Sequence, residues 1–221
     1  MSTASGRGWT LLPDVDIKPV DDLMLGPGGL LNVVPSWKLT ELPLATLQVW
    51  CVKRGVYQFP TEELIEWLST RIAGRNAIEI CAGNGVLGRT LGIPTTDSHM
   101  QTKPEIADYY RAMRQCPITP PPDVQRFDAN QAVNHYQPDV VIGAWVTQLW
   151  RPGDKEGSVQ GVDELAIVKA AEYIHVGNDG THGRKRVMRK QHERLRFDDW
   201  LISRGQDQSL NRIDVWRRGS K

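Results

Sequence analysis

A glycine-rich turn directly after an apolar segment is the feature that most constrains the fold of this chain. Residues 77–82 are mostly apolar and predict a strand, which runs into Gly83, Asn84 and Gly85. Residues 86–91 then predict a short helix. Glycines permit a sharp strand-to-helix turn and let the backbone come close to a ligand. With Gly88 the run is formally G-x-G-x-x-G, a pattern that nucleotide-type cofactor loops share with ordinary tight turns.

The segments around this turn predict an α/β protein with a Rossmann-like sheet. Residues 139–145 form an apolar run after Asp139, which is typical of a central parallel strand buried on both faces. Residues 199–203 and 212–216 predict two closing strands, and the segment between them is too short for a helical crossover, so this pair is expected to be antiparallel. Further strands are expected at 93–96, at 173–176 and before Asp128, and helices at 61–72, 105–114 and 162–171. We therefore expect a mostly parallel sheet with an antiparallel last strand and helices on both faces.

Acidic residues stand at the ends of three successive predicted strands, namely Glu79, Asp97 and Asp128. Ligands of open α/β sheets bind at the carboxyl ends of the strands. Carboxylates there can accept hydrogen bonds from ribose hydroxyls or from amino groups. Each acid alone could be a helix cap or a solvated turn residue, but three in matching places favour a ligand site.

The stretch 77–88 resembles the first motif of class I S-adenosylmethionine-dependent methyltransferases: an apolar strand, an acid, small residues and then Gly-x-Gly. The resemblance implies S-adenosylmethionine as cofactor and a methyltransferase sheet, whose last strand is also reversed. It places Glu79 near the methionine part, Asp97 on the ribose hydroxyls and Asp128 on the adenine amino group. The end of the fourth strand, with Trp145, would line the reacting methyl group.

Residues 55–61 resemble a segment that closes over the methionine end of the cofactor in several adenine methyltransferases. The residues that the resemblance assigns to the cofactor are Tyr57, Phe59, Pro60, Glu79, Ala82, Gly83, Asn84, Gly85, Leu87, Asp97, Ser98, Asp128, Ala129, Gly143, Ala144 and Trp145. Two positions depart from the family. Cys81 stands where the first glycine of the motif usually lies, and residues 143–147 replace the (Asn/Asp/Ser)-Pro-Pro-aromatic run of enzymes that methylate adenine or cytosine. The cofactor half of the site is therefore expected and the base-reading half is not.

Trp145 and His175 are the candidate catalytic residues. An aromatic face such as Trp145 or Tyr57 could stabilise the sulfonium cation, and His175 lies at the end of a predicted strand, from which it could face the substrate pocket. The glycine-rich segment 177–183 is expected to be a mobile loop that could act as a lid. No histidine lies at metal-ligand spacing from another histidine or a cysteine, so no metal is expected.

Two other functions remain open on the sequence alone. An NAD-dependent oxidoreductase would share the glycine pattern, but the acid of that fingerprint follows the glycines by about 20 residues, and Asp97 follows Gly83 by only 14. A non-catalytic S-adenosylmethionine-binding or scaffold protein would fit the lack of a catalytic signature.

Charge and composition favour a small-molecule acceptor in the cytoplasm. The net charge is +1, which gives no global attraction for nucleic acid or membranes. Residues 184–196 hold a basic stretch that could bind nucleic acid, although a solvated helix face is the favoured interpretation; its members are Arg184, Lys185, Arg186, Arg189, Lys190, Arg194 and Arg196. No apolar run reaches the ~18 residues of a membrane span, and the three cysteines are scattered without a C-x-x-C spacing.

The domain organisation is expected to be simple. Residues 1–47 are rich in turn formers and predict an N-terminal extension that packs on the core, while residues 48–221 predict the cofactor-binding domain. The N-terminus lacks the apolar core of a signal peptide, so a cytoplasmic location is expected. The sequence fixes neither the methyl acceptor nor the oligomeric state.

Overall fold

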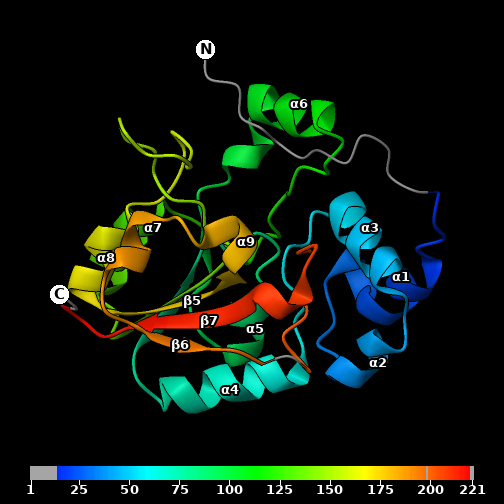
Figure 1. Cartoon of the computed structure of the whole chain (residues 1–221), viewed down its shortest axis with the longest axis horizontal. Coiled ribbons are helices and arrows are strands. Elements are labelled where there is room, and N and C mark those ends of the chain that lie inside the picture. The colour runs from blue at the N-terminus through cyan, green and yellow to red at the C-terminus, as the bar shows by residue number, and fades with distance from the viewer. Residues whose placement is uncertain (1–13, 198, 220–221) are drawn as a thin grey trace.

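Strands of one mixed sheet system lie at the centre of the protein, with helices against both faces (Figure 1). The computed structural model describes residues 14–197 and 199–219. Its strands are β1 (Ala77–Ile80), β2 (Thr96–Asp97), β3 (Gln125–Arg126), β4 (Val140–Ala144), β5 (Glu172–Asn178), β6 (Glu193–Leu195) and β7 (Asn211–Trp216). The α/β class expected from the sequence is confirmed.

The strand order is that of a doubly wound sheet with one reversed strand. Five strands follow the order β1-β4-β5-β7-β6, and β2 and β3 form a parallel pair beside β1. A parallel bridge between Glu79 and Thr95 joins the two parts. β1, β4 and β5 are parallel, whereas β7 runs antiparallel to both β5 and β6. Without β7, the order 3-2-1-4-5-6 is the Rossmann order.

Helices cover the sheet and its N-terminal flank. They are α1 (Lys18–Met24), α2 (Ser36–Thr40), α3 (Leu44–Arg54), α4 (Glu62–Ile72), α5 (Val86–Leu91), α6 (Pro104–Ala112), α7 (Ala129–Tyr136), α8 (Glu164–Ala170) and α9 (Asp179–His182). Short 3-10 turns are η1 (Pro27–Gly29), η2 (Met100–Thr102), η3 (Arg186–Arg189) and η4 (Gln208–Leu210). None of the helices within residues 14–197 and 199–219 is both long enough and apolar enough to cross a membrane.

Side-chain alternation along the central strands explains why helices lie on both faces. In β4, Val140 and Ile142 belong to the cluster that packs under α4 and α5, while Val141 belongs to the cluster under α7 and α8. Successive side chains of a strand point to opposite faces, so an unbroken apolar strand needs apolar cover on both sides. The carboxyl ends of β1, β4 and β5 are thereby held at one edge of a three-layer core.

The N-terminal helices form a third apolar cluster at the side of the sheet (Figure 1). Trp50 of α3 stacks on Phe59 with ring centroids 5.4 Å apart, and its indole N–H donates to Asp21 of α1. The domain boundary expected at residue 47 lies inside α3, because the apolar positions of this helix continue into the same cluster up to Cys51.

Two expectations for the C-terminal part are wrong. Residues 199–203 do not form the strand that pairs with β7. They bond instead to the segment before α4, where the Phe59 N–H donates to the carbonyl of Ile202 at 3.0 Å. The partner of β7 is β6, inside the basic stretch. The glycine-rich segment 177–183 is not an open loop, since it forms α9 with His182 buried.

Helix α5 packs very closely on β1, and Gly88 permits this. The Gly88 N–H donates to Glu79 Oε2 at 2.7 Å, and the Gly88 backbone lies against the Thr95 side chain. The last glycine of the G-x-G-x-x-G pattern therefore serves helix–strand packing, the role that its counterpart has in dinucleotide-binding folds.

Replacing Gly88 by alanine should destabilise the protein. The added Cβ would lie 2.2 Å from Thr95 Oγ1 and 2.8 Å from Glu79 Oε2, so α5 must shift away from β1. We expect a net loss of about 1–3 kcal/mol in the free energy of unfolding, even though alanine is favoured over glycine in a helix by about 1 kcal/mol. Urea denaturation measures this loss. T90A, an exposed position of the same helix, is the control, and equal stability of the two variants would contradict the packing role.

Candidate functional site

A cleft at the carboxyl edge of β1, β2 and β4 brings most of the predicted site residues together. It has two compartments, of about 420 Å³ and about 770 Å³ when counted out to their open mouths. Tyr57, Cys81, Gly83, Ile118 and Ala144 line both compartments. The smaller compartment also contains Glu79, Ala82, Asn84 and Leu87, and the larger also contains Asp97, Ser98, Asp128, Ala129 and Trp145.

The turn after β1 has the backbone conformation that glycine favours. Gly83 and Gly85 have φ angles of 55° and 71°, and Cys81 also adopts a left-handed φ of 52°. A non-glycine residue in this region costs roughly 1–2 kcal/mol. Cys81 thus stands at a position with a positive φ, and its side chain is half-buried at the wall of the cleft. Burial raises the pKa of the Cys81 thiol, which keeps it neutral.

Asp97 connects this turn to the end of β2. Its Oδ2 accepts a hydrogen bond from the Gly83 N–H at 3.1 Å, and its Oδ1 accepts one from the His99 N–H at 2.7 Å. Each carboxylate oxygen has more than one acceptor position. The half-buried carboxylate therefore keeps acceptor capacity on the cleft side while the backbone fixes its orientation.

Asp128 has a structural role at the same edge. It caps α7, since its Oδ1 accepts from the Asn130 N–H at 2.9 Å and Gln131 completes a capping box. Such a cap stabilises a helix by about 1 kcal/mol. The residue is exposed and lines the larger compartment, so the cap places a carboxylate on the cleft wall.

Glu79 is a buried acid that reaches helix α5. Its side chain is 2 % exposed, and burial raises the pKa of the carboxyl to about 8, while the hydrogen bond from the Gly88 N–H opposes this shift. The carboxyl is therefore largely protonated near neutral pH. It lies at the wall of the smaller compartment, but its defined partner is the helix backbone.

Trp145 directly follows β4 and has a left-handed backbone conformation. Its φ is 56°, and its N–H donates to the carbonyl of Val176 at 2.8 Å. The indole lies between Tyr57, at 5.9 Å between ring centroids, and His182, at 5.0 Å. Arg204 stacks on the Tyr57 ring at 4.3 Å. Tyr57 and Trp145 thus place aromatic rings, which attract cations, on one wall of the cleft.

Several predicted residues do not line the cleft. Phe59 is fully buried against Trp50, and Pro60 lies in the adjoining core, where its carbonyl accepts from the Val34 N–H. Gly143 is enclosed by Val146 and Tyr173, and Gly85 caps α5 against Val124. The prediction that His175 faces the substrate is corrected here, because its side chain is fully buried beneath the sheet edge.

Other residues of the cleft wall were not predicted from the sequence. They come from the segments that follow β2 and β4, and include Met100, Gln101, Tyr110, Ile118, Thr147, Gln160 and Val162. Gln101 Oε1 accepts from the Ile118 N–H at 2.9 Å, which ties the proline-rich segment over the cleft. No periodic pattern marks such loop residues, since their places depend on contacts between distant segments.

Three of the seven basic side chains of the stretch form ion pairs within the protein. Lys185 is buried and pairs with Glu164, Arg186 pairs with Asp154, and Arg194 pairs with Asp214. Side chains already paired with carboxylates offer little to phosphates. The structure therefore lends no support to a nucleic-acid partner at this stretch.

The described residues form no metal centre, and the sequence matches no known protein family. Within residues 14–197 and 199–219, no group of three or more His, Cys, Asp or Glu side chains is arranged to hold a metal ion. No protein-family model matches the chain, and no curated protein is a significant match.

Two solved structures resemble this one. One is Thermoplasma acidophilum 1320, with 16% identity over 83% of this chain and 95% of that one, and a TM-score of 0.34. The other is SMU.776, a proposed methyltransferase complexed with SAH, with 8% identity over 76% of this chain and 50% of that one, and a TM-score of 0.37. Both scores are low, so the function rests on the residues of the cleft alone.

The raised pKa of Glu79 predicts a pH-dependent stability. The pKa of the Glu79 carboxyl is 4.5 in the unfolded chain and about 8 in the folded protein. The contribution of the protonated carboxyl to the free energy of unfolding is therefore fully present below pH 4.5 and is lost as the pH rises through 8. Relative to E79Q, the wild type should lose up to about 1.4 kcal/mol per pH unit across this window. Denaturation at a series of pH values measures the difference. E66Q, on the exposed side of α4, should run parallel to the wild type, and a parallel curve for E79Q as well would contradict the assignment.

Proposed function

We propose that this chain is an S-adenosylmethionine-dependent methyltransferase that acts on a small-molecule acceptor. The observation that carries the proposal is a single cleft that gathers the glycine turn after β1, the acid at the end of β2 and the acid after β3. In the family that residues 77–88 resemble, these three positions hold the methionine part, the ribose and the adenine. The strand order, with its reversed β7, agrees with the same family.

The residues of the cleft fit the chemical groups of this cofactor. Asp97 keeps acceptor capacity for ribose hydroxyls, and its two backbone hydrogen bonds hold it in place. Tyr57 and Trp145 present aromatic faces to the same space, and such faces attract a cation within about 6 Å.

The mechanism assigned to the chain is one of binding and orientation. When bound, S-adenosylmethionine supplies an electrophilic methyl group on a sulfonium. Gly83 and its neighbours would hold the methionine end, Asp97 the ribose, and Asp128 with Ala129 the adenine end. Trp145 would form the wall against which the acceptor is aligned. Positioning of this kind can supply effective molarities of about 10⁵–10⁸ M.

The small-molecule acceptor is supported by charge. The chain is close to neutral, and three members of the basic stretch that could have held a polyanion are engaged with Glu164, Asp154 and Asp214. The acceptor side of the cleft is lined by uncharged side chains, among them Trp145, Thr147 and Gln160. The proposed location is the cytoplasm.

Calorimetry with three ligands tests the cofactor class. We expect S-adenosylmethionine and S-adenosylhomocysteine to bind and NAD not to bind. Binding of NAD with neither of the other two would overturn the proposal in favour of an oxidoreductase. Tight binding of the two adenosyl ligands without methyl transfer to any member of a broad acceptor panel would instead favour a non-catalytic binding protein.

Asp97 provides the test at the level of one residue. D97A should weaken S-adenosylhomocysteine binding at least tenfold, or about 1.4 kcal/mol, because it removes the charged acceptor for the ribose. D108A, which removes an exposed aspartate from α6, should bind like the wild type. Thermal melts of both variants establish that they are folded. Unchanged affinity in a folded D97A protein would refute the ribose role.

A further inference from the structure

The turn at Trp145 needs an external restraint. A left-handed φ at a bulky residue is unfavourable and persists only where its surroundings enforce it. The Trp145 N–H is held by the carbonyl of Val176, in the neighbouring strand β5. That bond fixes the start of the turn, but the next peptide group, at Val146, lies beyond the sheet ladder.

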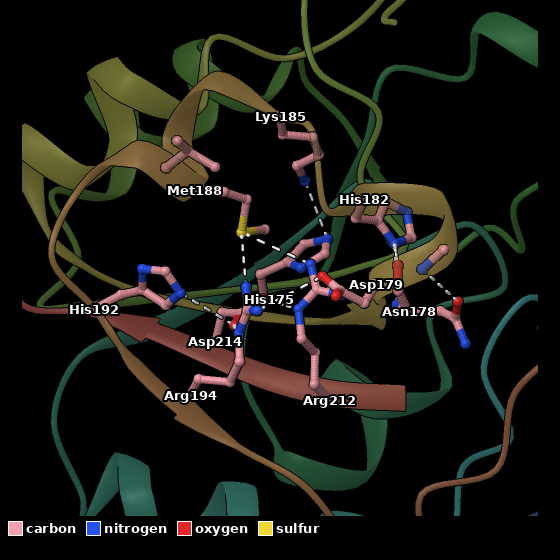
Figure 2. A network of polar contacts seen from close by, with 12 residues as sticks. His175, Asn178, Asp179, His182, Lys185, Met188, His192, Arg194, Arg212 and Asp214 are labelled. Atoms are coloured by element: carbon pink, nitrogen blue, oxygen red, sulfur yellow. Dashed lines mark hydrogen bonds and ion pairs between the residues drawn. The ribbon is translucent and has the colours of Figure 1, made fainter. Parts of the chain in front are cut away.

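The Lys185 side chain provides a second restraint on this turn. Its ammonium group donates to the carbonyl oxygen of Val146 at 3.0 Å, and its side chain is only 2 % exposed. The same group contacts Glu164 Oε1 at 2.6 Å and His175 Nε2 at 3.1 Å, so its three hydrogens have three partners. Figure 2 shows Lys185 pointing down onto His175, which projects from β5.

The partners of Lys185 are themselves fixed. Glu164 Oε1 also accepts from the Tyr173 hydroxyl at 2.9 Å, and Glu164 is 3 % exposed. Burial raises the pKa of Glu164 and lowers that of Lys185, while their ion pair opposes both shifts. Burial, with Lys185 beside it, holds the pKa of His175 well below its usual range, so the imidazole can accept from the ammonium group. A lysine held in this way has one position for its Nζ atom.

The same cluster also supports the Trp145 ring. His182 of α9 packs edge-on against the indole and against His175, with centroids 5.0 Å and 4.9 Å apart. The Asn178 N–H donates to His182 Nδ1 at 3.1 Å, and Asp179 pairs with the buried Arg212 at 2.8 Å. Figure 2 shows these side chains converging between α9 and β7. The indole is thus supported on one side while Tyr57 lies on another.

The energetics favour a positioning role over a stabilising one. A buried ion pair is often no more stabilising than apolar side chains of the same volume, since both charges must leave water. What an apolar residue at position 185 could not do is donate to the Val146 carbonyl. The ion pair therefore contributes a fixed hydrogen-bond donor at the floor of the cleft.

We propose that Lys185 is a positioning residue that holds the left-handed turn at Trp145 through the Val146 carbonyl and so presents the indole to the acceptor side of the cleft. Its importance for catalysis rests on the proposed methyltransferase function. The position of Trp145 itself does not, and it is measurable without any acceptor.

Fluorine NMR on protein labelled with 5-fluorotryptophan tests the proposal. W145F assigns the Trp145 resonance, and W37F assigns that of the exposed Trp37 as an internal reference. K185M removes the donor, and E164Q/K185M removes it without leaving a buried carboxylate unpaired. K169M, an exposed lysine of α8, is the matched control.

We expect the Trp145 resonance to shift or broaden in K185M and in E164Q/K185M, while the Trp37 resonance stays in place and K169M matches the wild type. The double variant should keep a melting temperature near that of the wild type, which separates the positioning role from a loss of fold. The dissociation constant for S-adenosylhomocysteine should rise about tenfold. An unmoved Trp145 resonance in the folded double variant would overturn the proposal. If the wild type failed to bind S-adenosylhomocysteine, the methyltransferase function would fall while the resonance still tested the role of Lys185.

Discussion

Strands β4 and β5 bury both of their faces, and this requirement determines where the other elements lie. Val140 and Ile142 need cover on one side of β4 and Val141 on the other, so the chain must cross the sheet between successive strands. Because β1, β4 and β5 are parallel, their carboxyl ends lie at a common edge. The turn after β1 and the turn after β4 face each other there, and the cleft lies between them. The location of the site is therefore a consequence of covering the core.

A second constraint acts at the far end of the sheet, where charges are buried. Arg212 and Asp214 are fully buried on β7, and Asp214 also receives Arg194 from β6. Because a charge without its partner in this environment would be strongly destabilising, the pair between Arg194 and Asp214 also favours β6 as the neighbour of β7. The pairs thereby set β6 beside β7, and with Asp179 they connect the closing strands to α9. The elements that support Trp145 are thus held by the same charges that fix the sheet edge.

The sequence predicted the parts of the fold whose signals are local. Helix α5 begins and ends between glycines, and α4 begins at Thr61, whose hydroxyl accepts from the Leu64 N–H. The apolar run of β4 and the antiparallel direction of the last strand, β7, were also predicted. β6 was missed because a three-residue strand is defined by its partner rather than by its own composition. Lys185 was predicted to belong to an exposed basic stretch, because a sequence pattern does not distinguish a solvated lysine from one that is buried against Glu164.

The joint between β1 and β2 has a consequence for how the molecule would behave without a ligand. β2 and β3 pair over only two residues each, and two backbone hydrogen bonds join them to the main sheet, from the Glu79 N–H to the Pro94 carbonyl and from the Ala82 N–H to the Thr96 carbonyl. Such a unit has few buried contacts of its own and opens at lower free energy than the ladder of β4, β5 and β7. We therefore expect the wall of the cleft that carries Asp97 to open more readily than the wall formed by β4. Without a ligand, the two walls would exchange their amide hydrogens at different rates. A molecule bound across both walls would act as a cross-link, and the two regions would then open as one cooperative unit.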